Sequence, residues 1–360
     1  MKNKHWHVIG VMSGTSLDGV DIVYVKIKRD NGYTFDILEK TTVNYSDEWK
    51  KNLQDAFNFS EKKLKDLDLK YGQFLGKLVR NFIVDNHITK VDLIASHGHT
   101  VFHKPEQGIT LQIGSGAEIA KDCELRVICD FRTQDVALGG QGAPLVPIGD
   151  LLLFNQYNFC LNLGGFANIS FQRKEVRVAF DICPVNIVLN HYTRSIGLEY
   201  DDKGEIASKG IIQADLLHEL NNLPFFLDDN PKSLGYEFIV DTILPLIDKF
   251  KLPIEDILRT FIEHSAFQVS EVINRNSKVF SKSDISVLVT GGGAFNNFLI
   301  QRIKHLSKSK IIIPSRDIID FKEALVFALL GVLKSEGEIN CLKSVTGARK
   351  DHSSGVLFYP

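Results

Sequence analysis

Two stretches of this 360-residue chain share one strand pattern, and such a repeat limits the folds that the chain can adopt. Short apolar or alternating runs predict three strands in each stretch. They lie at residues 5–12, 20–27 and 33–37 in the first, and at 159–163, 167–171 and 177–180 in the second. Between two strands of the first stretch, Asn31-Gly32 predicts a tight hairpin turn and antiparallel pairing. The sequence therefore predicts a structural repeat within an α/β protein.

Helices and further strands follow each repeat. Ser46 is a good N-cap for one helix, and periodic apolar residues predict a second helix over 64–82. The remaining predictions are strands at 92–95, 110–113, 126–129, 285–290 and 311–314, and helical segments within 184–273, 294–306 and 319–335. No low-complexity linker separates the halves. We therefore expect two closely packed domains, 1–133 plus 341–360 and 134–340, with a cleft that suits a ligand.

Composition excludes several classes of protein. Lys and Arg number 42 and Asp and Glu 44, so the net charge of -2 gives no general attraction to nucleic acid or to an anionic membrane. No apolar run approaches the ~20 residues that span a bilayer, and the apolar stretch before Ser13 is too short for a signal peptide. Five scattered cysteines without a C-x-x-C pair indicate neither a disulfide framework nor a thiolate zinc site. We expect a cytoplasmic protein.

The segment between the first two predicted strands has the composition of a phosphate-binding turn. Residues 13–21 (SGTSLDGVD) combine two glycines with hydroxyl and carboxylate side chains. Glycine lets backbone amides approach phosphate oxygens, and a carboxylate can hold hydrated Mg²⁺. The segment is not a Walker loop, because Val20 and Asp21 stand where Lys and Ser or Thr are required. A polar hairpin turn without a ligand is the alternative interpretation.

Asp181 is the candidate catalytic carboxylate. It ends a predicted strand, and a carboxylate at such a position facing a cleft can act as a general base. Pro184 suits the first turn of a following helix, so Asp181 could equally be an N-cap. Position in the sequence leaves both interpretations open.

Other polar or glycine-rich segments are weaker candidates. His97, His99 and His103 could form a metal site, but no carboxylate or cysteine lies at short range, so a polar substrate-contacting loop is favoured. The glycines of residues 291–293, between a strand and a helix, let the backbone pack against a flat or anionic ligand. Glu323, near the start of an apolar helix, is by default a solvated carboxylate that complements the helix dipole.

Together these segments resemble one family, the anhydro-N-acetylmuramic acid kinases. The motifs are residues 10–21 (GVMSGTSLDGVD), 96–98 (SHG), 130–132 (DFR), 139–147 (GGQGAPLVP), 161–170 (LNLGGFANIS), 291–294 (GGGA) and 345–348 (VTGA). They stand in the family's order along nearly the whole chain. The resemblance implies a duplicated actin-like, ribonuclease H-like two-domain sugar kinase fold, with the nucleotide in the interdomain cleft.

The resemblance also implies an activity. The enzyme would use ATP and magnesium (Mg²⁺) to phosphorylate O6 of 1,6-anhydro-N-acetylmuramic acid while water opens the anhydro ring. The product would be N-acetylmuramic acid 6-phosphate, in peptidoglycan recycling. The partners would be ATP and the amino sugar, with no nucleic acid and no membrane, and the protein would be a homodimer.

Site residues carry over from the family motifs by position. Asp181 would take a proton from the attacking water, and Asp18 would hold Mg²⁺. His97, Arg132 and Glu323 would line the sugar site. The residues that would bind the nucleotide are Gly14, Thr15, Ser16, Leu17, Asp18, Gly19, Val20 and Asp21, with Gly291, Gly292 and Gly293 near it.

Some positions depart from the family pattern, and they keep other functions open. Where the family has Asp-Thr-Gly-Pro-Gly-Asn, this chain has residues 181–186 (DICPVN), so both glycines are lost. His99 replaces a Gln, Ser115 an Asp and Phe295 a His. One alternative is a kinase of the same fold for a different amino sugar. Another is a nucleotide-gated interaction module, which would not need Asp181.

Overall fold

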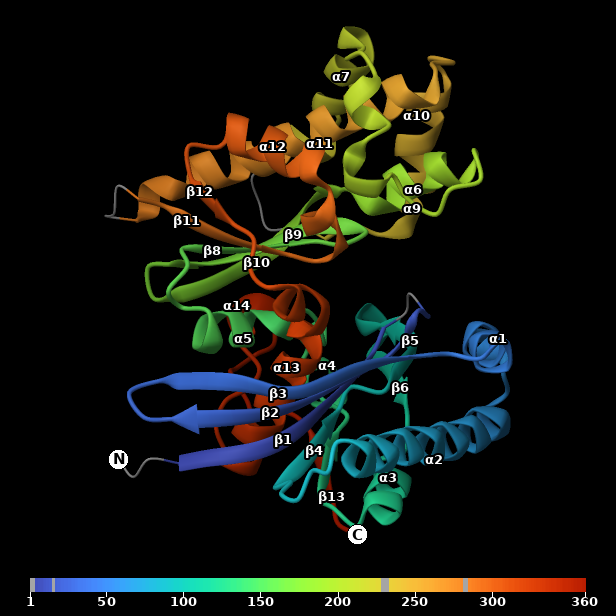
Figure 1. Ribbon diagram of the computed structural model, residues 1–360, viewed down its shortest axis with the longest axis vertical. Helices are drawn as coiled ribbons and strands as arrows, with labels where there is room; N and C mark the ends of the chain where they lie inside the picture. Colours follow the sequence, from blue (N-terminus) through green and yellow to red (C-terminus); the bar gives the residue numbers. More distant parts are fainter. Residues whose placement is uncertain (1–3, 15–16, 228–232, 281–283) are drawn as a thin grey trace. The chain divides into compact units, whose positions relative to one another are not determined.

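The computed structural model describes residues 4–14, 17–227, 233–280 and 284–360, and its chain divides into two compact units (Figure 1). Unit 1 comprises residues 1–153 and 321–360, and unit 2 comprises residues 154–320. The predicted division placed 134–153 and 321–340 with the second half, whereas here these segments belong to unit 1. Each unit is built on one main β-sheet.

The sheet of unit 1 has the order β13-β7-β4-β1-β2-β3. β1, β2 and β3 pair antiparallel, and β4 and β7 continue from β1 in parallel. β5 and β6 form a separate hairpin. The strands are β1 (Lys4–Ser13), β2 (Gly19–Arg29), β3 (Tyr33–Asn44), β4 (Leu93–Ser96), β5 (His99–Lys104), β6 (Ile109–Ile113), β7 (Val127–Cys129) and β13 (Val356–Phe358).

The sheet of unit 2 repeats this topology, with the order β10-β9-β8-β11-β12. β8, β9 and β10 pair antiparallel, and β11 and β12 continue from β8 in parallel. The strands are β8 (Phe159–Leu163), β9 (Phe166–Arg173), β10 (Val176–Pro184), β11 (Ser286–Thr290) and β12 (Lys310–Ile312). The same five-strand order in both units confirms the predicted duplicated α/β fold of the actin-like, ribonuclease H-like type.

Helices cover the sheets. In unit 1 they are α1 (Asp47–Asp55), η1 (Ala56–Asn58), α2 (Glu61–Asp85), η2 (Pro105–Gln107), α3 (Gly116–Cys123), α4 (Thr133–Ala137), α5 (Val146–Leu153), most of α13 (Arg316–Ser335) and α14 (Lys343–Thr346). In unit 2 they are α6 (Asn186–Arg194), η3 (Asp202–Gly204), η4 (Ala207–Lys209), α7 (Ala214–Asn221), α8 (Pro224–Leu227), α9 (Tyr236–Phe238), the π-helix η5 (Ile239–Ile243), α10 (Leu244–Asp248), α11 (Ile254–Asn276), η6 (Ser277–Val279), η7 (Gly292–Phe295) and α12 (Asn297–Leu306). Ser46 caps α1 as predicted, accepting a hydrogen bond from the Trp49 amide.

The two faces of β1 pack against different helices of unit 1. Ile9 and Val11 belong to the apolar cluster that also contains the buried face of α2. Gly10, between them, points to the opposite face, where α13 comes so close that a Cβ on Gly10 would lie 2.1 Å from the carbonyl oxygen of Ala324. The alternation of a strand therefore places one helix on each face of the sheet.

Two local predictions are wrong, at residues 99–104 and at Pro184. The predicted hairpin at Asn31-Gly32 and its antiparallel pairing are confirmed, through a three-residue loop in which neither residue has a positive φ. Residues 99–104 form a strand, because they pair with β6, where the sequence favoured a polar loop. Pro184 ends β10 instead of opening a helix, and α6 begins after it.

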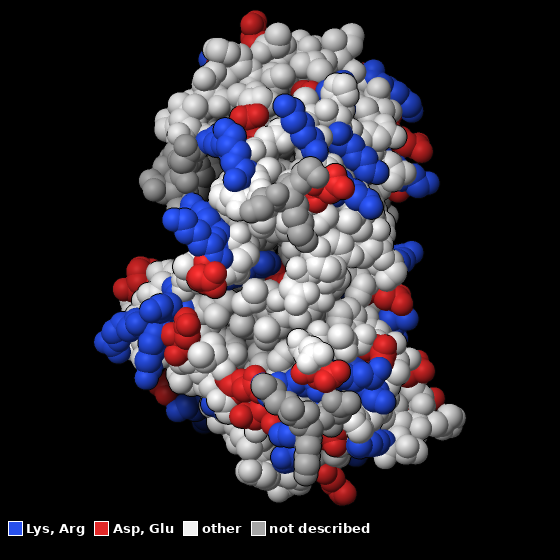
Figure 2. Space-filling view, turned by 90° about the vertical axis from the view of Figure 1, so that its left-hand side faces the viewer, with Lys and Arg blue, Asp and Glu red and all other residues white. Residues whose placement is uncertain are grey.

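The surface shows no sorting of charge by sign in the view of Figure 2, where basic and acidic side chains are interspersed on the visible face of each unit. Within the described part of the chain, no helix combines the length and the apolar character that a membrane span needs.

The contact at Gly10 generates a prediction about stability. Gly10→Ala should lower the free energy of unfolding by ~1–3 kcal/mol, because α13 has to move away from β1. Gly32→Ala is the control, since its Cβ would meet nothing within 4 Å. Urea unfolding followed by circular dichroism measures both variants. A Gly10→Ala variant as stable as the control would contradict this packing.

Candidate functional site

The turn between β1 and β2 carries the predicted phosphate-binding residues. Ser13 pairs with Val20 across its base, and the buried Ser13 hydroxyl donates to the Gly98 carbonyl at 2.8 Å. Leu17 has a φ of 60°, a conformation that costs a non-glycine residue about 1 kcal/mol. Backbone strain of this kind is concentrated at ligand-binding sites. The Asp18 carboxylate at the tip is exposed.

The predicted nucleotide-binding residues of this turn have different environments. Thr15 and Ser16 lie outside the described residues. Val20 is fully buried, and a Cβ on Gly19 would lie 2.6 Å from the Val43 carbonyl oxygen, so these two residues serve the packing of the hairpin. Asp21 is half-buried and accepts a hydrogen bond of 2.6 Å from the Thr42 hydroxyl. Gly14 and Leu17 are half-buried, and the Leu17 amide donates to the Gly14 carbonyl at 3.4 Å, whereas the Asp18 side chain is exposed.

His97 and Arg132 form a fixed pair in unit 1. The guanidinium donates to His97 Nε2 from Nε at 3.1 Å and from Nη2 at 2.9 Å, and it donates from Nη1 to the Gly142 carbonyl at 2.6 Å. Since a guanidinium only donates, Nε2 is unprotonated, and the proton on Nδ1 is donated to the Gly98 carbonyl at 2.8 Å. Burial, together with the charge of Arg132, lowers the pKa of His97 to about 3. His97 is therefore a neutral acceptor that orients Arg132.

Glu323 lies inside α13 and not in its first turn, because the helix begins at Arg316. Its side chain reaches solvent, while the protein packed around it raises the pKa of the carboxyl. Arg132 and Lys322 oppose that shift, and the negative charge of Asp21 adds to it. The structure therefore brings Glu323 within the electrostatic reach of Arg132 and of the opening hairpin, as expected for residues of one site.

Asp181 lies in unit 2 at a β-bulge of β10, where the pairing with β9 shifts register between Asp181 and Cys183. Its Oδ2 accepts a hydrogen bond of 2.9 Å from the Leu234 amide. Burial raises the pKa of the carboxyl, and the Leu234 amide opposes that shift. The N-cap interpretation is wrong, because Val185 is the N-cap residue of α6 and Asp181 makes no capping contact. A bulge turns a side chain out of the regular ladder, and bulges are over-represented next to active sites.

The residues that replace the family's glycines near Asp181 point into the core. Cys183 and Val185 are completely buried in the apolar cluster of unit 2. The Cys183 thiol lies 3.9 Å from the Ser265 carbonyl, and burial raises its pKa. The departures from the family pattern at these two positions therefore change the packing behind Asp181 and do not add side chains in front of it.

A cavity of about 860 Å³ lies within unit 2, a size that suits a small ligand. Its wall includes aromatic and aliphatic side chains, amide side chains and the cations Lys203, Lys304 and Arg316. The Arg316 guanidinium lies 5.6 Å from the centre of the Phe295 ring. The other lining residues are Asn186, Leu189, Asn190, Tyr200, Asp201, Asp202, Gly292, Ala294, Asn296, Asn297, Ile300, Gln301 and Ile313.

The glycine triplet has two functions. Gly291 has a φ of 80°, and a Cβ on it would lie 2.8 Å from the backbone of Leu163. A Cβ on Gly293 would lie 2.7 Å from the Leu163 side chain, so both residues allow η7 to pack on β8. Gly292 instead lines the cavity. The sequence marks the triplet and the neighbouring Phe295 but gives no signal for Arg316 as a wall residue, because no local motif includes it.

The three histidines of residues 97–103 do not converge. His97 and His99 are buried, whereas His103 is exposed, where its Nδ1 lies 3.3 Å from the Thr110 hydroxyl. Burial lowers the pKa of His99 to about 4. Within the described ranges these histidines form no cluster that could hold a metal ion.

Comparison with known proteins identifies relatives along the whole chain. The family model described as "Anhydro-N-acetylmuramic acid kinase" matches residues 6–360. A protein of that name from Bacillus cereus is 31% identical, with 98% of this chain and 99% of the relative covered. One from Francisella tularensis subsp. novicida is 33% identical, with 96% and 97% covered.

Solved structures show a weaker similarity. An activator of 2-hydroxyisocaproyl-CoA dehydratase from Clostridium difficile with bound ADPNP aligns with a TM-score of 0.44 at 12% identity, covering 92% of this chain and 96% of that chain. A hexokinase from Schistosoma mansoni complexed with glucose aligns with a TM-score of 0.36 at 10% identity, covering 90% and 85%.

The neutral His97 predicts a pH dependence of stability. Above pH 6.5 this residue is neutral in both the folded and the unfolded state. Between pH 6.5 and about 3 only the unfolded state binds its proton, so the free energy of unfolding falls as pH drops, by up to ~1.4 kcal/mol per pH unit. His97→Gln keeps an acceptor for Arg132 but cannot bind the proton. In this variant the free energy of unfolding should therefore fall less steeply with decreasing pH, by up to ~1.4 kcal/mol per pH unit.

Urea unfolding at pH 7, 6 and 5 measures this difference. The control is His305→Gln, which changes an exposed histidine of α12. Equal slopes for wild type and His97→Gln would mean that His97 is protonated in the folded protein.

Proposed function

This chain belongs to the anhydro-N-acetylmuramic acid kinase family, and from that premise we propose the reaction that its residues carry out. The chain transfers the γ-phosphoryl group of ATP to O6 of 1,6-anhydro-N-acetylmuramic acid while water opens the anhydro ring. The product is N-acetylmuramic acid 6-phosphate, formed in peptidoglycan recycling. The observation that carries this proposal is Asp181, a half-buried carboxylate at a strand bulge with a raised pKa.

The cavity of unit 2 is the proposed site for the nucleoside part of ATP. Phe295 and Tyr200 offer exposed aromatic faces against which a purine base can stack, and Ile300 adds an aliphatic wall. Lys304 and Arg316 supply positive charge for the phosphates. Gly292 leaves room for close approach, since the nearest atom to its Cβ position is 3.8 Å away.

The β1–β2 turn is the proposed site for the terminal phosphates and Mg²⁺. Mg²⁺ prefers oxygen ligands and keeps several of its waters, so an exposed carboxylate on a glycine-rich turn fits the ion. Asp18 has that position, and Asp21, held by Thr42, offers a second carboxylate nearby in the hairpin. Bound there, Mg²⁺ would neutralise charge on the transferring phosphoryl group.

Asp181 is the proposed general base for ring opening. It takes a proton from the water that attacks the anomeric carbon. The bond between that carbon and the bridging oxygen breaks, and the electron pair stays on O6. O6 attacks the γ-phosphorus while the bond from that phosphorus to the β–γ bridging oxygen breaks and ADP leaves. Burial suits this task, because a raised pKa brings the carboxylate closer to the pKa of an efficient base near neutral pH.

Arg132 is the proposed donor to the sugar. Its contacts with His97 and Gly142 occupy Nε–H and one N–H on each terminal nitrogen, so one N–H on each remains for a sugar oxygen. His97 fixes the plane of the guanidinium, and Glu323 supplies an acceptor for sugar hydroxyl groups. A preset orientation lowers the entropy that the substrate loses on binding.

Two further features belong to the proposal. We place the protein in the cytoplasm, which the five free thiols support, since none of the cysteines is in a disulfide. The family resemblance supports a homodimer.

The role of Asp181 is tested by an isosteric change. Asp181→Asn should lose ~10²–10⁴-fold in turnover, because the amide cannot accept the proton, while binding of ATP persists. The assay incubates the protein with ATP, Mg²⁺ and the anhydro sugar in ¹⁸O-water, and mass spectrometry follows the 6-phosphate and its label. Asp85→Asn, at the exposed end of α2, is the control for the loss of one charge. Near-normal turnover in Asp181→Asn would assign the base to another residue.

The role of Asp18 is tested separately. Asp18→Ala should reduce Mg²⁺-dependent turnover by ~10²-fold or more and leave the free energy of unfolding unchanged, because the side chain is exposed. Turnover is measured across a Mg²⁺ titration. Asp30→Ala removes an exposed carboxylate from the β2–β3 loop and should behave as wild type. An unchanged Mg²⁺ titration in Asp18→Ala would remove this residue from the metal site.

A further inference from the structure

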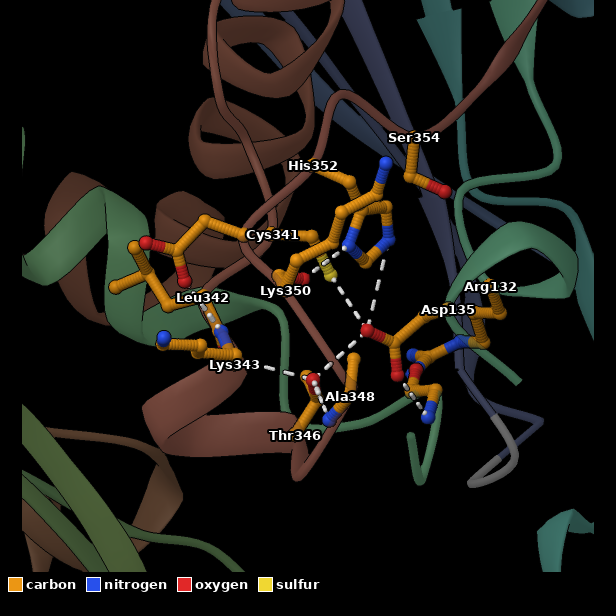
Figure 3. Close-up of polar contacts among 12 residues, drawn as sticks. Arg132, Asp135, Cys341, Leu342, Lys343, Thr346, Ala348, Lys350, His352 and Ser354 are labelled. Carbon is orange, nitrogen blue, oxygen red and sulfur yellow. Dashed lines mark hydrogen bonds and ion pairs between the residues drawn. The ribbon is translucent and has the colours of Figure 1, made fainter. Parts of the chain in front are cut away.

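Three potential metal ligands meet in the interior of unit 1, away from the β1–β2 turn in the sequence (Figure 3). They are Asp135 of α4, Cys341 after α13 and His352 near the C-terminus, with exposures of 0%, 1% and 5%. Asp135 Oδ1 lies 3.3 Å from Cys341 Sγ and 3.5 Å from His352 Nε2. All three ligand atoms lie within 4.8 Å of one another.

The protonation of His352 leaves a lone pair directed into this cluster. His352 Nδ1 lies 3.1 Å from the Lys350 carbonyl, which only accepts, so Nδ1 carries the proton. Nε2 is buried and has no hydrogen-bond donor within the described residues. In the neutral ring its lone pair faces the anionic oxygen of Asp135, which is repulsive. A cation between them removes the repulsion, and an Nδ1–H bonded to a backbone carbonyl is the usual arrangement of a metal-ligating histidine.

Hydrogen bonds hold all three ligand residues in place. Cys341 and His352 face each other in an isolated antiparallel bridge, with both N–H to C=O distances at 3.1 Å. The Gly142 amide donates to Asp135 Oδ2 at 2.7 Å, so that oxygen is held while Oδ1 points into the cluster. The Thr346 hydroxyl lies 2.7 Å from Oδ1. The ligands are thus preset by the fold.

The spacing suits a tetrahedral ion. Metal–ligand distances of about 2.0 to 2.3 Å place neighbouring ligand atoms of a tetrahedron roughly 3.3–3.8 Å apart. The distances of 3.3 and 3.5 Å from Oδ1 fall in that range. One nitrogen, one sulfur and one oxygen donor form a set that Zn²⁺ accepts and that Mg²⁺ or Ca²⁺ does not favour.

We propose that Asp135, Cys341 and His352 bind Zn²⁺ as a structural site, with a water as the fourth ligand. Without the ion, the Cys341 thiol donates to Asp135 Oδ1. When the ion binds, the thiol releases its proton to solvent and the sulfur becomes a thiolate ligand. One proton leaves for each ion bound, and no redox change occurs.

The ion would join three segments of unit 1. Asp135 belongs to α4, and its partner Gly142 also accepts the hydrogen bond from Arg132. Cys341 and His352 belong to the C-terminal segment. Zinc binding would therefore stabilise the connection between α4, the residue 139–142 loop and the C-terminal segment, and it would hold the loop on which Arg132 rests.

The test uses the full chain and measures metal directly. Protein expressed with zinc and then desalted should contain about one zinc per chain by elemental mass spectrometry. After removal of zinc, Co²⁺ should give thiolate-to-cobalt charge-transfer absorption and the intense visible bands of a four-coordinate site. Cys341→Ser should lose the charge-transfer band, and His352→Asn should lose bound zinc. Cys123→Ser, which changes a half-buried thiol outside the cluster, should retain both.

Thermal unfolding separates metal binding from a folding defect. Zinc should raise the melting temperature of wild type and of Cys123→Ser, and it should have no effect on Cys341→Ser or His352→Asn. Wild-type protein without zinc and without a cobalt spectrum would overturn the proposal. A charge-transfer band that persists in Cys341→Ser would also overturn it, because the thiolate would then lie elsewhere.

Discussion

The close contact between β1 and α13 at Gly10 is the packing on which the candidate sugar site of unit 1 depends. With hydrogen as its side chain, Gly10 lets the backbone of α13 approach the strand, where any Cβ would meet the Ala324 carbonyl oxygen. β1 leads into the β1–β2 turn, and α13 carries Glu323. The close packing of α13 on β1 therefore sets the position of the Glu323 carboxylate relative to the β1–β2 turn. A buried ion pair also holds α13 against α5. It joins Lys322 of α13 to Asp150 of α5 at 2.7 Å.

Arg132 shows how the interior of unit 1 controls a side chain of the site. Its guanidinium contacts His97 on one side and the Gly142 carbonyl on the other. Gly142 in turn donates to the fully buried Asp135, which contacts the C-terminal segment through Cys341, Thr346 and His352. A buried polar network of this kind is stabilising when its members are satisfied and costly when one is not. Among the described residues His352 Nε2 is the member of this network without a hydrogen-bond partner, and the proposed cation would supply one.

The candidate base in unit 2 depends on an irregularity in its strand. The bulge between Asp181 and Cys183 lets Cys183 enter the core while Asp181 stays half-buried and accepts from the Leu234 amide. Because the replaced glycines face the core, their loss is compatible with the family's reaction. The candidate base at Asp181 and the core packing at Cys183 therefore belong to the two sides of one bulge.

The sequence by itself determined the features that depend on neighbours along the chain. Periodicity and local conformation predicted the repeated three-strand units, the Ser46 cap and the glycine segments. The repeat in turn predicted the duplicated α/β fold. The motif residues His97, Arg132 and Glu323 were predicted as one group, and unit 1 brings them together. Local signals failed at Pro184, where pairing of β10 with β9 continues the strand through a residue that favours a helix start.

Only the tertiary structure decided which distant side chains meet. The approach of Arg316 to Phe295 and the cluster of Asp135, Cys341 and His352 join residues that no short motif connects. The scattered cysteines indicated no thiolate zinc site, and spacing along the chain describes only ligands on one local segment. Strand pairing and helix packing instead place Cys341 opposite His352 and bring both to Asp135. Such convergence arises from the packing of whole segments, which the periodicity of any single segment does not contain.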